Sequence, residues 1–204
     1  MKLFLIWFIR TFEYMSISAD HINLLSKLTG VRLINALKIK WSFHYSKWTK
    51  KPKVKGFPIS LTIEPTTACN LGCPECPSGL KQFSRPEGNI KQDFYKTIID
   101  QVYKQTYYLN FYFQGEPYIN PDFLQMVNYA NSKKMYTATS TNAHFLNDKN
   151  AKATIESGLS RLTISIDGTT QETYESYRKN GSLDKVLEGA KNVVKWKKEL
   201  KSKT

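Results

Sequence analysis

With 204 residues, of which 41% are hydrophobic and 13% aromatic, the chain fits a single globular domain with a buried core, and these values exclude a disordered chain. The formal net charge is +13 and is uneven, because residues 1–55 hold 11 Lys/Arg and 2 Asp/Glu whereas residues 56–204 hold 19 and 15. A basic segment of this kind can meet nucleic acid, anionic lipid or an acidic partner, or can form a solvated lysine-rich surface.

Residues 1–55 are predicted to form a basic helical extension with a linker, ahead of a core at residues 56–204. The apolar run Leu3–Ile9 is much shorter than the roughly 20 residues that a membrane span needs, so we expect an amphipathic or docking helix and no transmembrane segment. A signal peptide is the alternative, although no small-residue cleavage site follows. Apolar residues keep helical spacing on both sides of Gly30, and we expect the later aromatic residues to pack against the core: Trp41, Phe43, Tyr45 and Trp48.

After the charged linker at residues 47–56, strands and helices alternate along the chain. Period-two alternation and β-prone runs predict strands at 59–64, 107–113, 135–139 and 161–166. Helical spacing and caps predict helices at 90–104, 121–132, 147–158, 170–178 and 183–200. Four consecutive βα units predict a parallel sheet with right-handed crossovers, in which the active site gathers in the loops at the carboxyl ends of the strands.

All three cysteines lie in the loop after the first predicted strand, as Cys69, Cys73 and Cys76 in a C-x3-C-x2-C spacing. Three thiols cannot pair evenly into disulfides, and their clustering predicts a reducing, cytoplasmic compartment. Three thiolates leave one coordination position open, both on a tetrahedral zinc ion and on one iron of a four-iron cluster. Both metals stay open at this point, and the open position favours chemistry over a structural role.

Polar residues also follow the other three predicted strands. They are Gln114-Gly115-Glu116-Pro117, Ser140-Thr141-Asn142 and Asp167-Gly168. Because parallel strands end on one rim of a sheet, these loops and the cysteine loop are predicted to converge on one site. The structural alternatives are a helix-start carboxylate for Glu116 and a turn residue for Asn142. His144, in the third loop, is a candidate to face a substrate.

The C-x3-C-x2-C motif after the first strand of a βα series resembles the radical S-adenosylmethionine (radical SAM) superfamily. The resemblance implies that Cys69, Cys73 and Cys76 bind three irons of a [4Fe-4S] cluster, whose fourth iron binds the amino and carboxylate groups of S-adenosylmethionine (SAM). It implies reductive cleavage of SAM to a 5′-deoxyadenosyl radical that abstracts hydrogen from a substrate. A flavodoxin- or ferredoxin-type reductant is implied as well.

The remaining loops resemble the same family in kind. Gln114-Gly115-Glu116 resembles the Gly-Gly-Glu that meets the SAM amino group, and Thr141-Asn142-Ala143 resembles Thr-Asn-Gly. Ser165-Ile166-Asp167-Gly168 resembles the S-x-D-G of the branch that often carries a C-terminal SPASM extension, which implies a peptide or protein substrate. The implied SAM-binding residues are Gly115, Glu116, Asn142, Ser165, Asp167 and Arg178.

Two departures from the family pattern bear on the predicted fold. The family core has six βα units and this chain is predicted to hold four, as a partial parallel (βα) barrel. No cysteine follows Cys76, so we expect no SPASM extension. The alternative function is a truncated, non-catalytic iron–sulfur or zinc-binding protein. A nucleic-acid-binding module rests on the charge of residues 1–55 alone, without an RNA-binding aromatic signature, so we expect no nucleic-acid partner.

Overall fold

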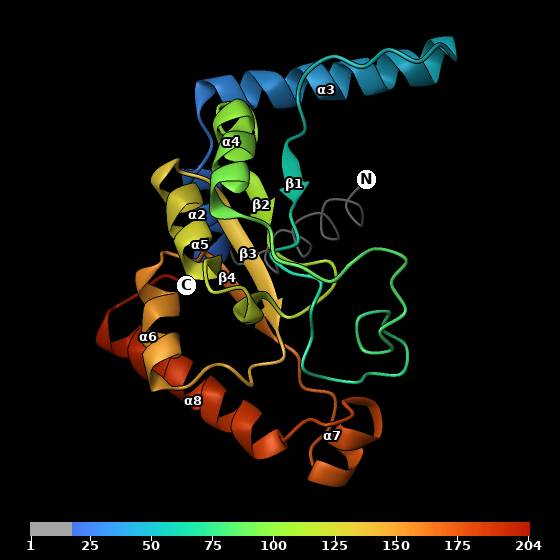
Figure 1. Ribbon diagram of the computed structural model, residues 1–204. Coiled ribbons are helices and arrows are strands. Elements are labelled where there is room, and N and C mark those ends of the chain that lie inside the picture. Colours follow the sequence, from blue (N-terminus) through green and yellow to red (C-terminus); the bar gives the residue numbers. More distant parts are fainter. Residues whose placement is uncertain (1–17) are drawn as a thin grey trace, which may run out of the picture.

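The computed structural model describes residues 18–204, and the predicted helix at Leu3–Ile9 lies outside them. Two amino-terminal helices precede four strand–helix units (Figure 1). The elements are α2 (Ala19–Ser26), α3 (Gly30–Thr49), β1 (Ser60–Thr62), α4 (Gln92–Val102), β2 (Tyr108–Asn110), the 3-10 helix η1 (Pro117–Ile119), α5 (Phe123–Ser132), β3 (Tyr136–Thr141), α6 (Asp148–Glu156), β4 (Arg161–Ile164), α7 (Gln171–Tyr177) and α8 (Leu183–Glu199).

The four strands form one parallel sheet in the order β1-β2-β3-β4. Leu61 pairs with Leu109, Leu109 with Thr137, and Thr139 with Leu162. Because all four strands run the same way, their carboxyl ends lie on one rim, where the cysteine loop and α7 are found (Figure 1). The predicted α/β fold with a partial parallel sheet is therefore confirmed.

Two apolar clusters hold the helices to one face of the sheet. The first joins β1, β2 and β3 to α4 and α5 through Ile63, Tyr95, Ile99, Leu109, Phe111, Phe123, Met126, Val127, Ala130, Met135 and Leu159. The second lies under α6 and α8 and contains Ala143, Leu146, Ala151, Ile155, Tyr174, Leu183, Val186 and Val193. Burial of these side chains is the main source of stability, at roughly 25 cal/mol per Å² of apolar surface removed from water.

The predicted helix at 121–132 begins later in the structure, at Phe123, with Asp122 as its N-cap. Asn120, two residues before this N-cap, is buried, and its side-chain oxygen accepts a hydrogen bond from the Asp122 amide (2.9 Å). Its Nδ2 donates to the carbonyl oxygens of Pro65 (2.7 Å) and Ile90 (3.3 Å). Asn120 therefore ties the start of this helix to the loop between β1 and α4.

The prediction that the aromatic residues of the extension pack against the core is wrong for Trp41, Phe43 and Trp48, whose side chains are exposed. The side of α3 that is buried carries Arg32, Asn35 and Ser42 instead. The chain after α3 packs back along this side (Figure 1), and Asn35 exchanges two hydrogen bonds with Phe57.

No helix among residues 18–204 is both long and apolar enough to cross a membrane.

Candidate functional site

The four strand-end loops enclose one cavity of about 200 Å³. All three cysteines line it, together with residues from the loops after β2, β3 and β4. The lining residues are Cys69, Leu71, Cys73, Cys76, Gly79, Tyr112, Phe113, Gly115, Glu116, Ser140, Thr141, Asn142, Ser165, Tyr177 and Arg178. The convergence expected from a parallel sheet therefore occurs, and it brings the cysteines and five of the six other predicted residues to one cavity.

The cysteine loop is held by hydrogen bonds within its own backbone and also contacts the end of α7. The Cys76 amide donates to the Cys73 carbonyl (3.2 Å), and the Gly72 amide donates to the Lys179 carbonyl (3.0 Å). The thiols are all free, and burial raises the pKa of both Cys69 and Cys73. The His, Cys, Asp and Glu side chains of residues 18–204 do not converge in threes on a single-ion site.

Arg178 lies beside one of these thiols. Its Nη1 is 3.9 Å from the Cys73 Sγ, and its Nε donates to an Asp167 carboxylate oxygen. Arg178 lines the cavity, whereas Asp167 does not. Asp167 thus orients a guanidinium that places positive charge next to a cysteine, and Arg178 counteracts the effect of burial on the Cys73 pKa. A fixed positive charge at this place favours the thiolate form that metal binding requires.

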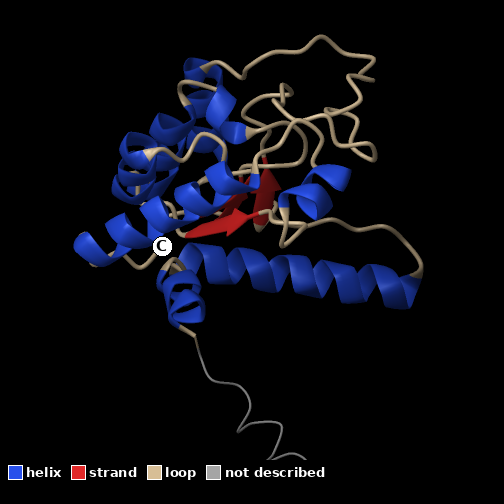
Figure 2. Cartoon of the chain, turned by 90° about the horizontal axis from the view of Figure 1, so that it is seen from below, coloured by secondary structure: helices blue, strands red, loops and turns tan. Residues whose placement is uncertain are grey.

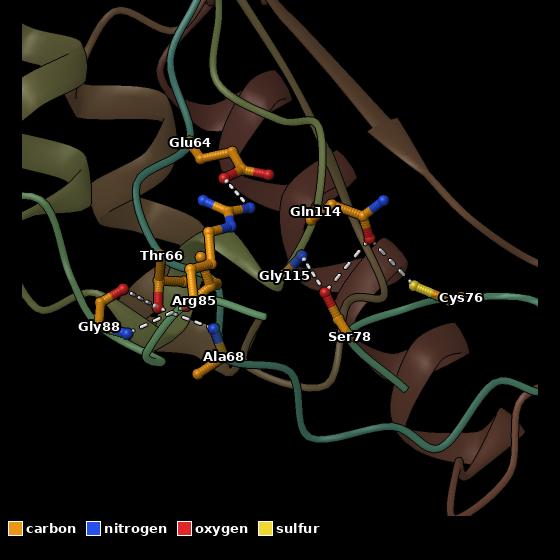
Figure 3. Close-up of polar contacts among 10 residues, drawn as sticks. Glu64, Thr66, Ala68, Cys76, Ser78, Arg85, Gly88, Gln114 and Gly115 are labelled. Carbon is orange, nitrogen blue, oxygen red and sulfur yellow. Dashed lines mark hydrogen bonds and ion pairs between the residues drawn. The ribbon is translucent and has the colours of Figure 1, made fainter. Parts of the chain in front are cut away.

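Gln114, at the position where the resemblance expects a glycine, contacts the third cysteine (Figure 3). Its Oε1 lies 3.4 Å from the Cys76 Sγ and 3.3 Å from the Ser78 Oγ. Ser78 in turn accepts a hydrogen bond from the Gly115 amide (2.9 Å). The side chains of Gln114 and Ser78 therefore join the cysteine loop to the loop after β2. Sequence reasoning did not find Ser78, because nothing local distinguishes it from an ordinary loop serine.

Gly115 needs to be glycine for two reasons that the structure makes visible. Its φ of +76° lies in the left-handed region, which costs other residues about 1 kcal/mol or more. A Cβ at this position would also lie 2.3 Å from the Thr66 carbonyl oxygen. The Glu116 amide next to it donates to the Ala68 carbonyl (2.8 Å), so the backbone of this loop lies directly against the start of the cysteine loop.

Glu116 is a buried carboxylate that joins the loops after β2 and β3. Its Oε1 accepts from the Thr141 hydroxyl (2.7 Å) and the Tyr118 amide (3.4 Å), and its Oε2 accepts from the Asn142 amide (2.8 Å). Burial raises the pKa of Glu116, and these hydrogen bonds oppose that rise. Glu116 forms no ion pair within residues 18–204. A carboxylate accepts about four hydrogen bonds, so one acceptor position on Oε2 is left for a donor in the cavity.

The loop after β3 is held to the cysteine loop by Asn142. Its Nδ2 donates to the Asn70 side-chain oxygen (2.8 Å), and its Oδ1 accepts from the His144 amide (3.1 Å). Asn142 is therefore more than a turn residue. Ala143 follows at φ +64°, which explains why the resemblance expects glycine there. Ser165, the residue after β4, lines the cavity, and its hydroxyl lies 3.2 Å from that of Ser140.

His144, a sequence candidate for facing the substrate, uses both ring nitrogens inside the protein. Its Nε2 accepts from the Ser182 amide at the N-cap of α8 (2.8 Å), so Nδ1 carries the proton and donates to the Asn142 carbonyl oxygen (3.0 Å). Burial lowers the pKa of His144. The neutral ring thus connects the loop after β3 to α8.

Stability is expected to fall in acid because of this ring. The folded-state pKa of His144 lies below the ordinary value of 6.5, so its contribution is fully present above that pH and is lost as the pH falls through the folded pKa. Protonation removes the acceptor for Ser182, at about 1 kcal/mol. We expect His144→Leu to lower the free energy of unfolding by this amount at neutral pH and to flatten its decline in acid, as measured by urea unfolding. The exposed His44→Leu serves as the control, and an unchanged pH dependence in His144→Leu would contradict the assignment.

Comparisons with known proteins agree with this architecture. The sequence model of the Radical SAM superfamily matches residues 63–198. The mycofactocin maturase MftC of Mycobacterium tuberculosis is 34% identical over 138 residues, which cover 67% of this chain and 34% of the relative. An AdoMet-dependent heme synthase of Methanosarcina barkeri is 29% identical over 133 residues, covering 65% and 38%. The chain therefore spans about a third of the length of the curated relatives it matches.

Solved structures share the fold. Native anSMEcpe with bound AdoMet superposes with a TM-score of 0.58 at 23% identity, over 69% of this chain and 42% of that one. Streptococcus suis SuiB bound to S-adenosylmethionine gives a TM-score of 0.58 at 21% identity, over 76% and 35%. The relatives confirm the predicted family and its SPASM-associated branch. With the family sequence over residues 63–198 and the family fold around the cysteine cavity, the chain belongs to the radical SAM superfamily, whose enzymes use a [4Fe-4S] cluster and S-adenosylmethionine.

Proposed function

We propose that Cys69, Cys73 and Cys76 each bind one iron of a [4Fe-4S] cluster and that the adjoining cavity binds SAM. The observation that carries this proposal is the composition of the cavity wall. Three free thiols line it together with Glu116, a buried carboxylate that has no cationic partner within residues 18–204 and one acceptor position left. An α-amino group of a ligand would supply both the missing charge and the missing donor.

Held by Cys69, Cys73 and Cys76, a reduced cluster would supply the electron for reductive cleavage of SAM to methionine and a 5′-deoxyadenosyl radical, which would abstract hydrogen from the substrate. The residues of this chain bind, orient and shield these groups. Glu116, with the Gly115 backbone against the cysteine loop, receives the amino group of SAM. Asn142 and Ser165 offer polar atoms at the cavity wall, and Arg178 offers a guanidinium for the carboxylate, held in place by Asp167.

We further propose that the substrate is a peptide or protein and that a flavodoxin- or ferredoxin-type protein is the reductant. The names of the relatives support the substrate class, since one is a mycofactocin maturase and another, of Rhodopseudomonas palustris, is a PqqA peptide cyclase. The chain covers about a third of each, so the activity of these whole proteins comes to this chain as a proposal. Exposed Tyr112 and Phe113 at the cavity offer apolar surface on which a substrate can pack.

A direct assay tests the activity. After anaerobic reconstitution with iron and sulfide, reduced protein incubated with SAM is expected to form 5′-deoxyadenosine and methionine, measured by chromatography and mass spectrometry. The unreduced sample is the control. A protein with a full complement of iron and sulfide that forms no 5′-deoxyadenosine would count against the enzyme and would favour the non-catalytic metal-binding alternative.

Loss of the charge at position 116 is expected to weaken SAM binding. In Glu116→Gln one acceptor oxygen becomes an NH2 group that faces donors or the ligand ammonium. The loss of a charged hydrogen bond predicts about a 10- to 100-fold rise in the dissociation constant of SAM, measured by calorimetry on the reconstituted protein. Glu64→Gln is the matched control, because Glu64 follows β1 and pairs with Arg85 outside the cavity. Equal SAM affinity in Glu116→Gln and the wild type would sink the assignment of Glu116.

A further inference from the structure

Helix α3 has the reverse of the usual surface-helix pattern. Its buried residues are Arg32, Asn35 and Ser42, all polar. On another face, four large apolar side chains at spacings of three, four and seven form a stripe along the helix. This stripe consists of Ile34, Leu37, Trp41 and Trp48, with 55%, 58%, 50% and 85% of their surface exposed. Exposed apolar patches of this kind mark interaction sites, so we expect this face to have a partner.

The neighbouring structure extends the same surface. In α2, Ile22 and Leu25 are also exposed, and in the segment after α3 so are Val54 and Phe57. The stripe residues Ile34, Leu37 and Trp41 line a hollow of about 660 Å³ together with Lys38, Lys55 and Gly56. Figures 1 and 2 both show α3 projecting beyond the sheet, away from the cysteine loop. The surface is thus separate from the proposed catalytic cavity and accessible to a large, flat partner.

The charge of this surface is entirely positive. From residue 21 to residue 63 the sequence contains no Asp or Glu. Its basic residues are Lys27, Arg32, Lys38, Lys40, Lys47, Lys50, Lys51, Lys53 and Lys55. Lysine ammonium groups border the stripe itself, with the Nζ of Lys53 at 5.7 Å and that of Lys55 at 5.2 Å from the Trp41 ring centroid. The partner therefore combines an apolar layer with negative charge.

We propose that α3 and the segment after it bind the surface of an anionic lipid bilayer, with the stripe inserted between the headgroups. A helix with lysines beside Trp and Leu side chains lies in the bilayer interface, where tryptophan is favoured and each basic residue near the surface adds attraction to anionic lipid. A nucleic acid would match the charge and leave Ile34 and Leu37 without a role, because aliphatic side chains neither pair with phosphate nor stack on bases.

Vesicle sedimentation with the full chain tests the proposal. We expect the protein to sediment with vesicles of phosphatidylcholine and phosphatidylglycerol and to stay in solution with phosphatidylcholine alone. Binding should weaken as salt is raised, because screening shortens the range of the attraction. Failure to bind the anionic vesicles at low salt overturns the proposal, whatever the SAM-cleavage assay shows, since the two surfaces are separate.

Paired variants separate charge from insertion. Lys40→Gln/Lys47→Gln is expected to lower the partition coefficient about 25-fold, at about fivefold for each lysine. The control Lys197→Gln/Lys198→Gln, on the exposed end of α8, removes the same charge and should change partitioning by less than about twofold.

A second pair of variants tests insertion of the stripe. Leu37→Ser/Trp48→Ser is expected to lower the partition coefficient by about tenfold or more. The control Phe94→Ser/Val194→Ser, exposed on α4 and α8, should leave the partition coefficient unchanged. The four apolar side chains replaced here are exposed, so an unchanged unfolding temperature is expected and would show that these variants are folded.

A nucleic-acid arm completes the test. The same protein is titrated with single-stranded RNA under the conditions of the vesicle assay. If RNA binds as tightly as the anionic vesicles, and if binding of both survives in Leu37→Ser/Trp48→Ser, then the surface is a general polyanion site and membrane insertion is refuted. If vesicle binding alone is lost in that variant, the bilayer is the partner of the stripe.

Discussion

Replacement of any one of Cys69, Cys73 or Cys76 by alanine is expected to abolish the visible iron–sulfur absorbance of the reconstituted protein and its cleavage of SAM. On the proposed assignment each thiolate binds a different iron, and no other cysteine exists in the chain to replace it. Iron and sulfide content, the visible spectrum and 5′-deoxyadenosine formation measure the outcome.

The matched control for these variants is Glu75→Gln. Glu75 lies in the same loop between Cys73 and Cys76 with its side chain exposed, so its replacement should leave iron content and colour unchanged. Circular dichroism shows whether the alanine variants keep their fold. A folded variant lacking one cysteine that retained its iron, sulfide and colour would refute the ligand set.

Replacement of Arg32 by alanine is expected to lower the free energy of unfolding by about 3 kcal/mol or more. The Arg32 guanidinium is buried and donates to the carbonyl oxygens of Lys27 (2.6 Å), Tyr103 (2.7 Å) and Lys133 (3.1 Å). These three residues are the C-caps of α2, α4 and α5. The last carbonyls of a helix have no partner within it and carry partial negative charge, so one cation satisfies three helix ends.

Urea unfolding followed by circular dichroism measures this effect. Arg32→Lys should lie between the wild type and Arg32→Ala, since a lysine keeps the charge and loses the planar donor array. Arg161→Ala is the control, because Arg161 is largely exposed and its ion pair with Asp20 spans 3.9 Å, so it should change the free energy by less than about 1 kcal/mol. If Arg32→Ala were no more destabilised than this control, the capping role would be wrong.

The sequence alone was sufficient for the architecture of the core. Strand and helix periodicities predicted four βα units, and the structure confirms a four-stranded parallel sheet in sequence order. The strand-end rule then predicted that the cysteine loop, Glu116, Asn142 and Asp167 would meet. Cys69, Glu116 and Asn142 line one cavity, whereas Asp167 does not. These features could be predicted because they depend on local patterns and on one geometric fact, that parallel strands end on the same rim.

The tertiary structure alone decided how those residues are used. Glu116 accepts hydrogen bonds from Thr141, Asn142 and Tyr118. Asp167 lies outside the cavity lining and pairs with Arg178. Trp41, Phe43 and Trp48 of α3 were expected to pack against the core, and they are exposed. Sequence periodicity shows which residues share a helix face, but it does not show whether that face packs against the core or lies in solvent. Arg32 and Asn35 are buried because their donors reach carbonyls of Tyr103, Lys133 and Phe57, and hydrogen bonds between residues far apart in the chain leave no local sequence pattern.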